Sequence, residues 1–248
     1  MTPEKNDPQG RRGFLRQVAL AAAAAPLSGG LLAAEVPAGI AAPPAAAGSA
    51  AAGPLPGYAS LSPDEAGFLE ALLNLMCPAD QLTPNGVDCG LAVFIDRQLA
   101  GDFGRGARLY RQGPWPAGKP ELGYQLPLTP EQYFKAGIAA ATAACRKAHG
   151  KRFEELAPAE AEAFLQELAS DKLDDGQFAL GAWFNGLVYP LFEQACFADP
   201  MYGGNINKVF WKMVGYPGLP ATHANDMLEF RGKPFPGAAD PKSIADFS

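Results

Sequence analysis

Four cysteines and two histidines are the residues of this 248-residue chain best suited to bind a metal or attack a substrate. Cys77, Cys89, Cys145 and Cys196 are 12, 56 and 51 residues apart, which matches no iron–sulfur or zinc spacing. No Cys-x-x-Cys-His sequence is present to attach a c-type haem. In an oxidising compartment cysteines form disulfides, so we expect Cys77 and Cys89 to close a short loop. For the other two cysteines, burial as thiols, mutual pairing and pairing with a partner protein are alternatives.

The histidines do not lie in a recognisable catalytic motif. His149 precedes Gly150 among basic residues, which is typical of the positive C-terminal end of a helix. His223 lies in a polar segment near the C-terminus, where it could act with Asp199 as the acid–base pair of a free-standing enzyme. The chain has no dinucleotide-binding Gly-x-Gly-x-x-Gly, phosphate-binding loop, Gly-x-Ser-x-Gly or His-Glu-x-x-His motif. We therefore expect no catalytic, cofactor-binding or metal-binding residues in this chain.

The segment from residue 197 to 218 combines turn-forming residues with aromatic side chains and few charges. An Asp-Pro followed by Gly-Gly-Asn predicts tight turns with positive φ angles. Few charges and several aromatic residues are typical of the core of a protein interface. The residues that we expect at such an interface are Asp199, Tyr202, Gly203, Gly204, Asn205, Trp211 and Tyr216.

Two other interpretations of the aromatic residues remain open. The segment could fold back on its own helices. Alternatively, Trp115, Trp183 and Trp211 could line the site of a sugar-binding module.

The elements around this segment are predicted to be helices. Proline follows Ser62, Thr129 and Ala157, and the first two positions also have Glu or Gln three residues later, forming capping boxes. Further helices are expected over residues 88–99 and 178–197, the latter kinked by Pro190. Residues 101–126 show neither helical nor strand periodicity, and no alternating strand pattern appears. The sequence predicts an all-α fold: a single irregular helical domain over residues 58–248 with long loops rich in aromatic residues, Gly and Pro.

Charge is distributed unevenly along the chain. Its 20 bases and 26 acids give a net charge of −6, but the first 16 residues contain four bases and two acids. The remainder is acidic, which argues against a nucleic-acid partner because that would require a cationic surface.

The N-terminal residues resemble an export signal. Arg11, Arg12, Phe14 and Leu15 precede an alanine-rich apolar stretch, as in the twin-arginine signals that direct folded proteins across the bacterial inner membrane. A cytosolic tail and an N-terminal anchor are the alternatives. We expect residues 1–38 to form the signal, with an uncertain cleavage site, and residues 39–57 to form a flexible Ala/Pro/Gly linker.

Three stretches carry a family resemblance that covers about residues 60–227. Residues 72–80, 199–205 and 211–218 resemble the gluconate 2-dehydrogenase subunit 3 family, the small or gamma subunits of bacterial membrane-associated sugar and polyol dehydrogenases. Ile206 and Phe210 stand where the family pattern has an arginine and a glycine, so contacts of that arginine are not carried over.

The resemblance implies a small subunit without redox chemistry of its own. Its expected partners are a large FAD-dependent flavoprotein, often with an iron–sulfur cluster, and a multihaem cytochrome c that passes electrons to membrane quinones. The small subunit would carry the export signal that the large subunit lacks and bring it to the twin-arginine translocase. The resemblance thus implies a periplasmic complex, peripheral to the inner membrane, whose cofactors are bound by the partner subunits.

Overall fold

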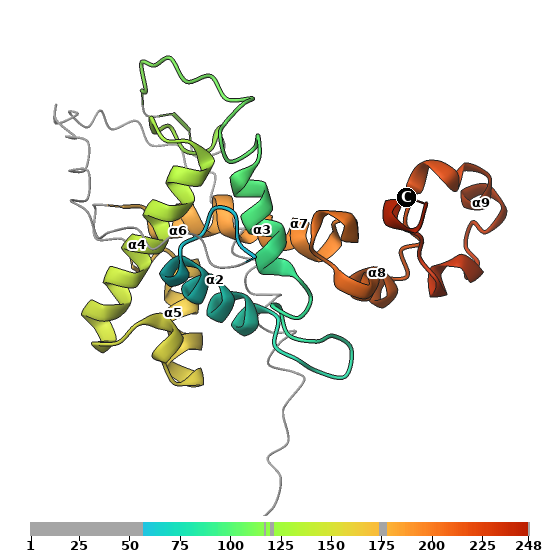
Figure 1. Ribbon diagram of the computed structural model, residues 1–248, viewed down its shortest axis with the longest axis horizontal. Helices are drawn as coiled ribbons and strands as arrows, with labels where there is room; N and C mark the ends of the chain where they lie inside the picture. The colour runs from blue at the N-terminus through green and yellow to red at the C-terminus, as the bar shows by residue number, and fades with distance from the viewer. Residues whose placement is uncertain (1–56, 117, 120–121, 174–177, 248) are drawn as a thin grey trace, which may run out of the picture. The chain divides into compact units, whose positions relative to one another are not determined.

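The computed structural model describes residues 57–116, 118–119, 122–173 and 178–247. The chain divides into two units, Met1–Ala51 and Ala52–Ser248, and all the described residues belong to the second. The expected export signal, with Arg11, Arg12, Phe14 and Leu15, and all of the expected linker except Gly57 lie outside the described residues. Within the described ranges the chain forms helices and loops but no strand, which confirms the all-α prediction (Figure 1).

The three proline-marked helices begin where the sequence predicts. Helix α2 spans Pro63–Met76, α4 spans Pro130–His149 and α5 spans Pro158–Ala169. Ser62 and Thr129 cap the first two through complete capping boxes, while the Glu160 carboxylate accepts the Ala157 N–H at 3.0 Å. Gly150 ends α4 in the left-handed region, at φ 70°.

The helix α3 spans Leu91–Ala100 and therefore begins later than expected. The prediction placed its start at residue 88, but residues 87–90 form a turn in which Gly90 has φ 79°. A helix cannot continue through that conformation. After α3, the described residues between 101 and 126 lie mostly in turns and irregular structure, as predicted.

The predicted 178–197 helix is a continuous helical run built from three parts. Helix α6 spans Leu180–Trp183, the π-helical turn η3 spans Phe184–Val188, and α7 spans Tyr189–Phe197. The Tyr189 N–H donates to the carbonyl of Phe184, five residues earlier. The wider turn lies just before Pro190, which has no N–H to donate. The predicted disturbance at Pro190 is thus a π-helical turn.

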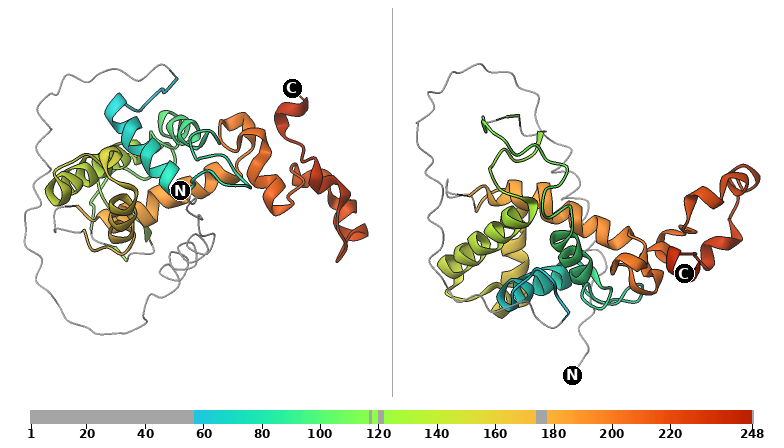
Figure 2. Two further views of the ribbon diagram at one scale, coloured as in Figure 1. Left: turned by 90° about the horizontal axis from the view of Figure 1, so that it is seen from below. Right: turned by 45° about the horizontal axis from the view of Figure 1, so that its top comes forward.

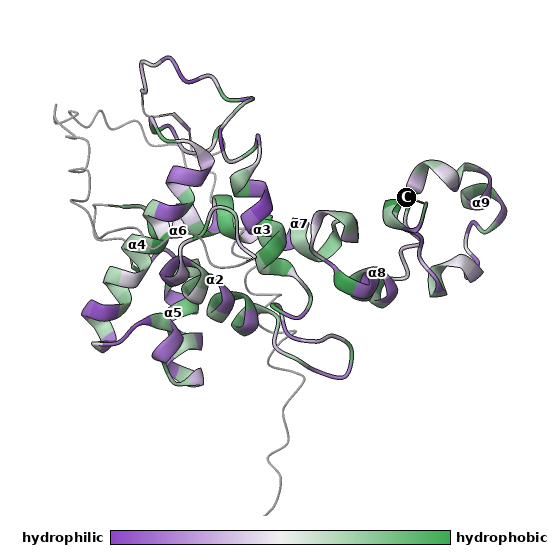
Figure 3. Ribbon diagram, viewed as in Figure 1, coloured by the Kyte–Doolittle hydropathy of each residue, from purple (hydrophilic) through white to green (hydrophobic). Residues whose placement is uncertain are grey.

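The helices pack around large buried side chains. Helix α2 contacts α3, α4 and α5, and α4 contacts α6. Hydrophobic and hydrophilic residues both occur along α2, α4 and α5 (Figure 3). Trp183 is fully buried with its ring at 6.0 Å from that of Phe134, and Phe153 lies between Phe68 and Phe164. Each such side chain contributes about 1.5–3 kcal/mol by leaving water. This core holds α7, and α7 leads directly to the candidate site.

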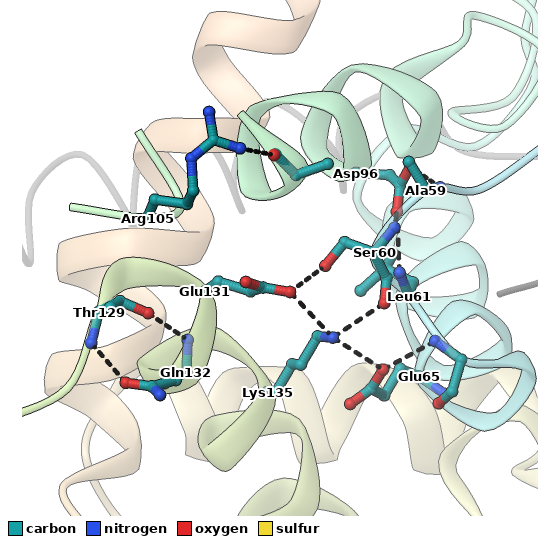
Figure 4. A network of polar contacts seen from close by, with 12 residues as sticks. Ala59, Ser60, Leu61, Glu65, Asp96, Arg105, Thr129, Glu131, Gln132 and Lys135 are labelled. Atoms are coloured by element: carbon teal, nitrogen blue, oxygen red, sulfur yellow. Dashed lines mark hydrogen bonds and ion pairs between the residues drawn. The ribbon is translucent and has the colours of Figure 1, made fainter. Parts of the chain in front are cut away.

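A buried carboxylate holds the first residues of the domain. Asp96 of α3 is 1% exposed and accepts the backbone N–H groups of residues 59, 60 and 61 at 2.6–2.9 Å. The Lys135 ammonium donates to the Ser60 carbonyl at 2.8 Å, and the Ser60 hydroxyl donates to Glu131 at 2.6 Å (Figure 4). Side chains from α3 and α4 therefore fix the point at which the folded domain begins.

Candidate functional site

The segment singled out in the sequence, residues 199–218, follows α7 and is called here the signature segment. It contains the 3₁₀ turns η4 (Pro200–Tyr202) and η5 (Ile206–Lys208) and the short helix α8 (Val209–Val214). Figures 1 and 2 show α8 and α9 (Ala224–Glu229) at the end of α7 that lies away from α4 and α5. The signature segment is therefore built at one end of the helical core.

Asp199, at the start of the signature segment, also contacts the C-terminal region of the chain. One carboxylate oxygen accepts the Met201 N–H at 3.0 Å and caps η4, and the other accepts the Ile244 N–H at 2.8 Å. Two further contacts join the same regions: the Lys242 N–H donates to the Pro217 carbonyl at 2.9 Å, and Lys208 pairs with Asp246 at 2.5 Å. We call these three contacts the C-terminal clamp.

Asn205 is a buried support of the signature segment. Its side chain is fully buried, its amide nitrogen donates to the Ala198 carbonyl at 3.1 Å, and its amide oxygen accepts the Phe210 N–H at 3.0 Å. Its φ angle is 50°, a conformation that asparagine tolerates better than most residues. Gly203, at φ 104°, and the buried Gly204 provide the neighbouring turn.

Trp211 and Tyr216 line a groove on the surface. Trp211 is 4% exposed and donates its indole N–H to the Phe197 carbonyl at 2.9 Å, and the Tyr216 ring meets it edge-on at 5.2 Å. The groove has a volume of about 480 Å³. Its lining is mostly apolar: Phe197, Asp199, Trp211, Val214, Tyr216, Leu219, Pro220 and Ile244.

A second hollow shares Phe197 and Asp199 with the groove and extends to Tyr202 and to Phe94 of α3. Apolar side chains around both hollows are exposed to solvent, including Phe197 at 49%, Tyr202 at 48% and Val214 at 55%. Ile244 of the groove is also exposed, as are four apolar residues close in sequence to those that line the hollows: Met201, Ile206, Met213 and Phe247. We call this area the apolar rim. Clustered exposed apolar side chains of this kind mark interaction surfaces more often than scattered ones do.

The structure thus brings together all seven residues that the sequence placed at an interface, but in two roles. Tyr202 is exposed and Tyr216 lines the groove, whereas Asn205 and Trp211 are buried and position the loop. Sequence reasoning missed Phe197, Val214 and the C-terminal Ile244. The apolar residues after residue 243 were a signal in the sequence. Only the fold shows that this part of the chain returns to the signature segment.

The four cysteines, all within the described residues, are buried and form no disulfide with one another in the structure. The pairing of Cys77 with Cys89 therefore stays a prediction. Burial raises the pKa of the Cys196 thiol, and the neighbouring Cys77 and Cys89 raise it further. Burial also raises the pKa of Cys145, which lies on α4.

The geometry does not favour the alternative enzyme or sugar-binding sites. His223 contacts Asp226 at 2.7 Å, whereas Asp199 is engaged by Met201 and Ile244. The Asp199–His223 pair of the alternative enzyme interpretation is therefore not formed. Trp183 is enclosed in the core, and neither it nor Trp115 lines the groove that contains Trp211.

Within the described ranges, no three His, Cys, Asp or Glu side chains are grouped so that they could hold a metal ion. None of the helices in that same part of the chain is both long and apolar enough to cross a membrane.

Within the described residues, fold and site together define an all-α protein with an apolar surface groove, built by the loops that follow α7. The chain belongs to the gluconate 2-dehydrogenase subunit 3 family, whose model matches residues 63–218, more than half of its length. That membership implies a subunit of a multi-subunit dehydrogenase complex. Searches of curated proteins and of solved structures found no significant match.

Proposed function

We propose that this chain is the non-catalytic small subunit of a periplasmic FAD-dependent sugar or sugar-acid dehydrogenase. In this role it binds the large flavoprotein subunit, escorts it through twin-arginine export, and afterwards stabilises it. The substrate-oxidising chemistry, FAD and any iron–sulfur cluster belong to the large subunit. A multihaem cytochrome c completes the complex at the inner membrane.

The observation that carries the proposal is the apolar rim. Its exposed side chains include Phe197, Tyr202 and Val214, which line two adjoining hollows and lie inside the family match. Both charged groups named above are already engaged in this area, since Asp199 accepts two backbone N–H groups and Lys208 pairs with Asp246. A partner that covers the rim therefore removes apolar surface from water without leaving these groups unpaired.

The supports beneath the rim suit it to rigid binding. Asn205 and Trp211 each hydrogen-bond to the end of α7, so the exposed residues are held in place before a partner arrives. Pre-ordering of this kind lowers the entropic cost of association. Because the subunit would bind only the native flavoprotein, it would also raise the stability of that partner.

The proposal is tested by co-expression with the large subunit. Tyr202→Glu together with Val214→Glu places two charges on the rim at exposed positions, where the fold should tolerate them. We expect co-purification of the large subunit to fall at least ~10-fold, because burying an unpaired charge costs well over 1.4 kcal/mol. The matched control is Leu109→Glu, at another exposed apolar position that lies outside both hollows. Unchanged co-purification of the double variant would refute binding through the rim.

The export role is tested separately through the N-terminal arginines. Arg11→Lys with Arg12→Lys should leave the complex assembled but confined to the cytoplasm, so that dehydrogenase activity is lost from the periplasmic fraction. The charge is unchanged, which separates recognition of the arginine pair from electrostatic attraction. Normal periplasmic activity of the double variant would contradict the escort role.

A further inference from the structure

Cys77 and Cys89 lie at the two ends of a tightly closed loop between α2 and α3. The Gly86 N–H donates to the Cys77 carbonyl at 2.8 Å, and the Val87 N–H donates to the Asn74 side chain at 3.0 Å. Gly86 itself packs so closely that an added Cβ would lie 2.6 Å from the Leu73 carbonyl oxygen. The loop is thus folded onto the end of α2, which brings its two cysteines together.

Both sulfur atoms approach the same backbone atom. Cys77 Sγ lies 3.8 Å from the Pro84 carbonyl oxygen, and Cys89 Sγ lies 3.6 Å from it. Burial, the charge interactions with Cys77 and Asp88 and the hydrogen bond with Cys77 together raise the pKa of Cys89 to about 11. The two thiols are therefore direct neighbours inside the loop.

The same loop supports the signature segment. The Cys89 carbonyl accepts the Ile206 N–H at 3.1 Å. The next residue, Gly90, lies so close that an added Cβ would be 2.2 Å from the Gly203 carbonyl oxygen. The loop at Cys89 is therefore in direct contact with residues 203–206 of the signature segment.

We propose that Cys77 and Cys89 form a disulfide under oxidising conditions, and that this bond restricts the motion of residues 203–206 of the signature segment. The oxidant is a disulfide-containing compound. A thiolate of the pair attacks it and forms a mixed disulfide, and the second thiolate then displaces the oxidant's other sulfur. The protein loses two hydrogen atoms and gains one S–S bond, while the oxidant is reduced to two thiols. The bond does not depend on the proposed partner or on the export route.

The experiment uses the purified full-length chain and oxidised glutathione. Because the thiols are buried and their reactive form is the thiolate, oxidation should be faster at alkaline pH. Intact mass should fall by two hydrogen atoms, alkylation after denaturation should detect two thiols instead of four, and peptide mapping should link Cys77 to Cys89. A bond to Cys196, glutathione adducts without an internal bond, or four remaining thiols would overturn the proposal.

The second part is tested by amide hydrogen exchange of residues 203–206 in the oxidised and reduced protein. We expect at least ~3-fold slower exchange after oxidation, since a local cross-link restricts opening of the loop. Cys145→Ser is the matched control and should show the same slowing, whereas Cys89→Ser should show none. If Cys89→Ser does not fold, the wild-type comparison still decides. Equal exchange in the two wild-type forms would show that the bond does not restrict the motion of residues 203–206.

Discussion

Two asparagines two positions apart in the signature segment illustrate how one residue type can have different roles. Asn205 and Asn207 both have positive φ angles, 50° and 60°, but only Asn205 is buried and hydrogen-bonded through its side chain to residues 198 and 210. Asn207 is exposed. The backbone conformation is thus common to both positions, and the buried hydrogen bonds are particular to Asn205.

Replacing each asparagine by alanine should separate these contributions. Asn207→Ala should lower the free energy of unfolding by about 1 kcal/mol, because alanine tolerates the left-handed conformation less well than asparagine does. Asn205→Ala should lower it by about 3 kcal/mol, because the buried Phe210 N–H also loses its acceptor. Urea unfolding of both variants measures the difference. Equal losses would mean that the Asn205 side chain contributes nothing beyond its backbone conformation.

The sequence located the signature segment but could not assign these roles. Gly203, Gly204 and Asn205 indicated turns because these residue types tolerate positive φ angles, which is a local property. Whether Trp211 faces solvent or the end of α7 depends on packing between elements far apart in the chain. The anchoring role of Asp96 was also beyond sequence reasoning, because its partners lie 35–37 residues earlier.

Glu131, in the network at the start of the domain, provides a pH-dependent contribution. Burial raises its pKa, but hydrogen bonds from Ser60 and Lys135 and the Lys135 charge outweigh this effect, and the net pKa lies below the ordinary 4.5. Because the folded-state pKa is lowered, Glu131 stabilises the protein fully above pH 4.5, and the stabilisation is lost as the pH falls through the lowered value.

Unfolding free energies of wild type and Glu131→Gln should therefore differ by a constant amount near neutral pH and converge as the pH falls below the ordinary 4.5 and through the lowered pKa of Glu131. Ser60→Ala is the informative control, since it removes one donor and should move the convergence to higher pH. A difference that stays constant over the whole range would exclude this contribution.

At the scale of elements, local signals placed helix starts well and helix contacts poorly. The capping boxes at Ser62 and Thr129 depend on residues three positions apart and were identified correctly. The start of α3 was misplaced because Gly90 has a positive φ angle that its neighbours in sequence do not reveal. The close packing of α4 on α6 was likewise invisible, although a small residue, Gly137, marks the point of contact.

Two glycine-to-alanine substitutions in helices should have opposite effects. At Gly137 an added Cβ would lie 2.1 Å from the Trp183 ring, so Gly137→Ala should destabilise the fold by about 1–3 kcal/mol through overpacking. At Gly67 of α2 the nearest atom would be 3.8 Å away, so Gly67→Ala should stabilise by about 0.5–1 kcal/mol through helix propensity. Thermal unfolding of both variants provides the comparison. Destabilisation of similar size at both positions would show that the close contact is not the cause.

At the scale of the described molecule, the C-terminal residues serve the candidate site and not the helical core. Lys242, Ile244 and Asp246 contact residues 217, 199 and 208 of the signature segment. The pKa of Asp246 is lowered by its hydrogen bonds from Lys208 and from the Ser243 N–H. The all-α fold follows from local sequence patterns, but this return of the chain does not, because nothing near residues 242–246 specifies their partners.

Deleting residues 242–248 should therefore leave the far-ultraviolet circular dichroism of the helical core nearly unchanged. Amide exchange in residues 199–218 should become at least ~10-fold faster, because the deletion removes the three contacts of the C-terminal clamp that oppose local opening. Leu228→Ala, at an exposed position of α9, is the control and should have no such effect. Unaltered exchange in the truncated chain would show that the clamp does not order the segment.

The network at the start of the domain also has a consequence for the order of events during synthesis. A ribosome makes the chain from its N-terminus, so residues 59–61 emerge 35–37 residues before Asp96, and Ser60 emerges 75 residues before Lys135. The contacts of residues 59–61 with Asp96 and Lys135 cannot form until α3 and the first turns of α4 have left the ribosome. Nascent chains arrested before residue 96 should expose residues 59–61 to protease, and chains arrested well beyond residue 149 should protect them. Residues 59–61 would thus be held in place only after much of the helical fold had been made.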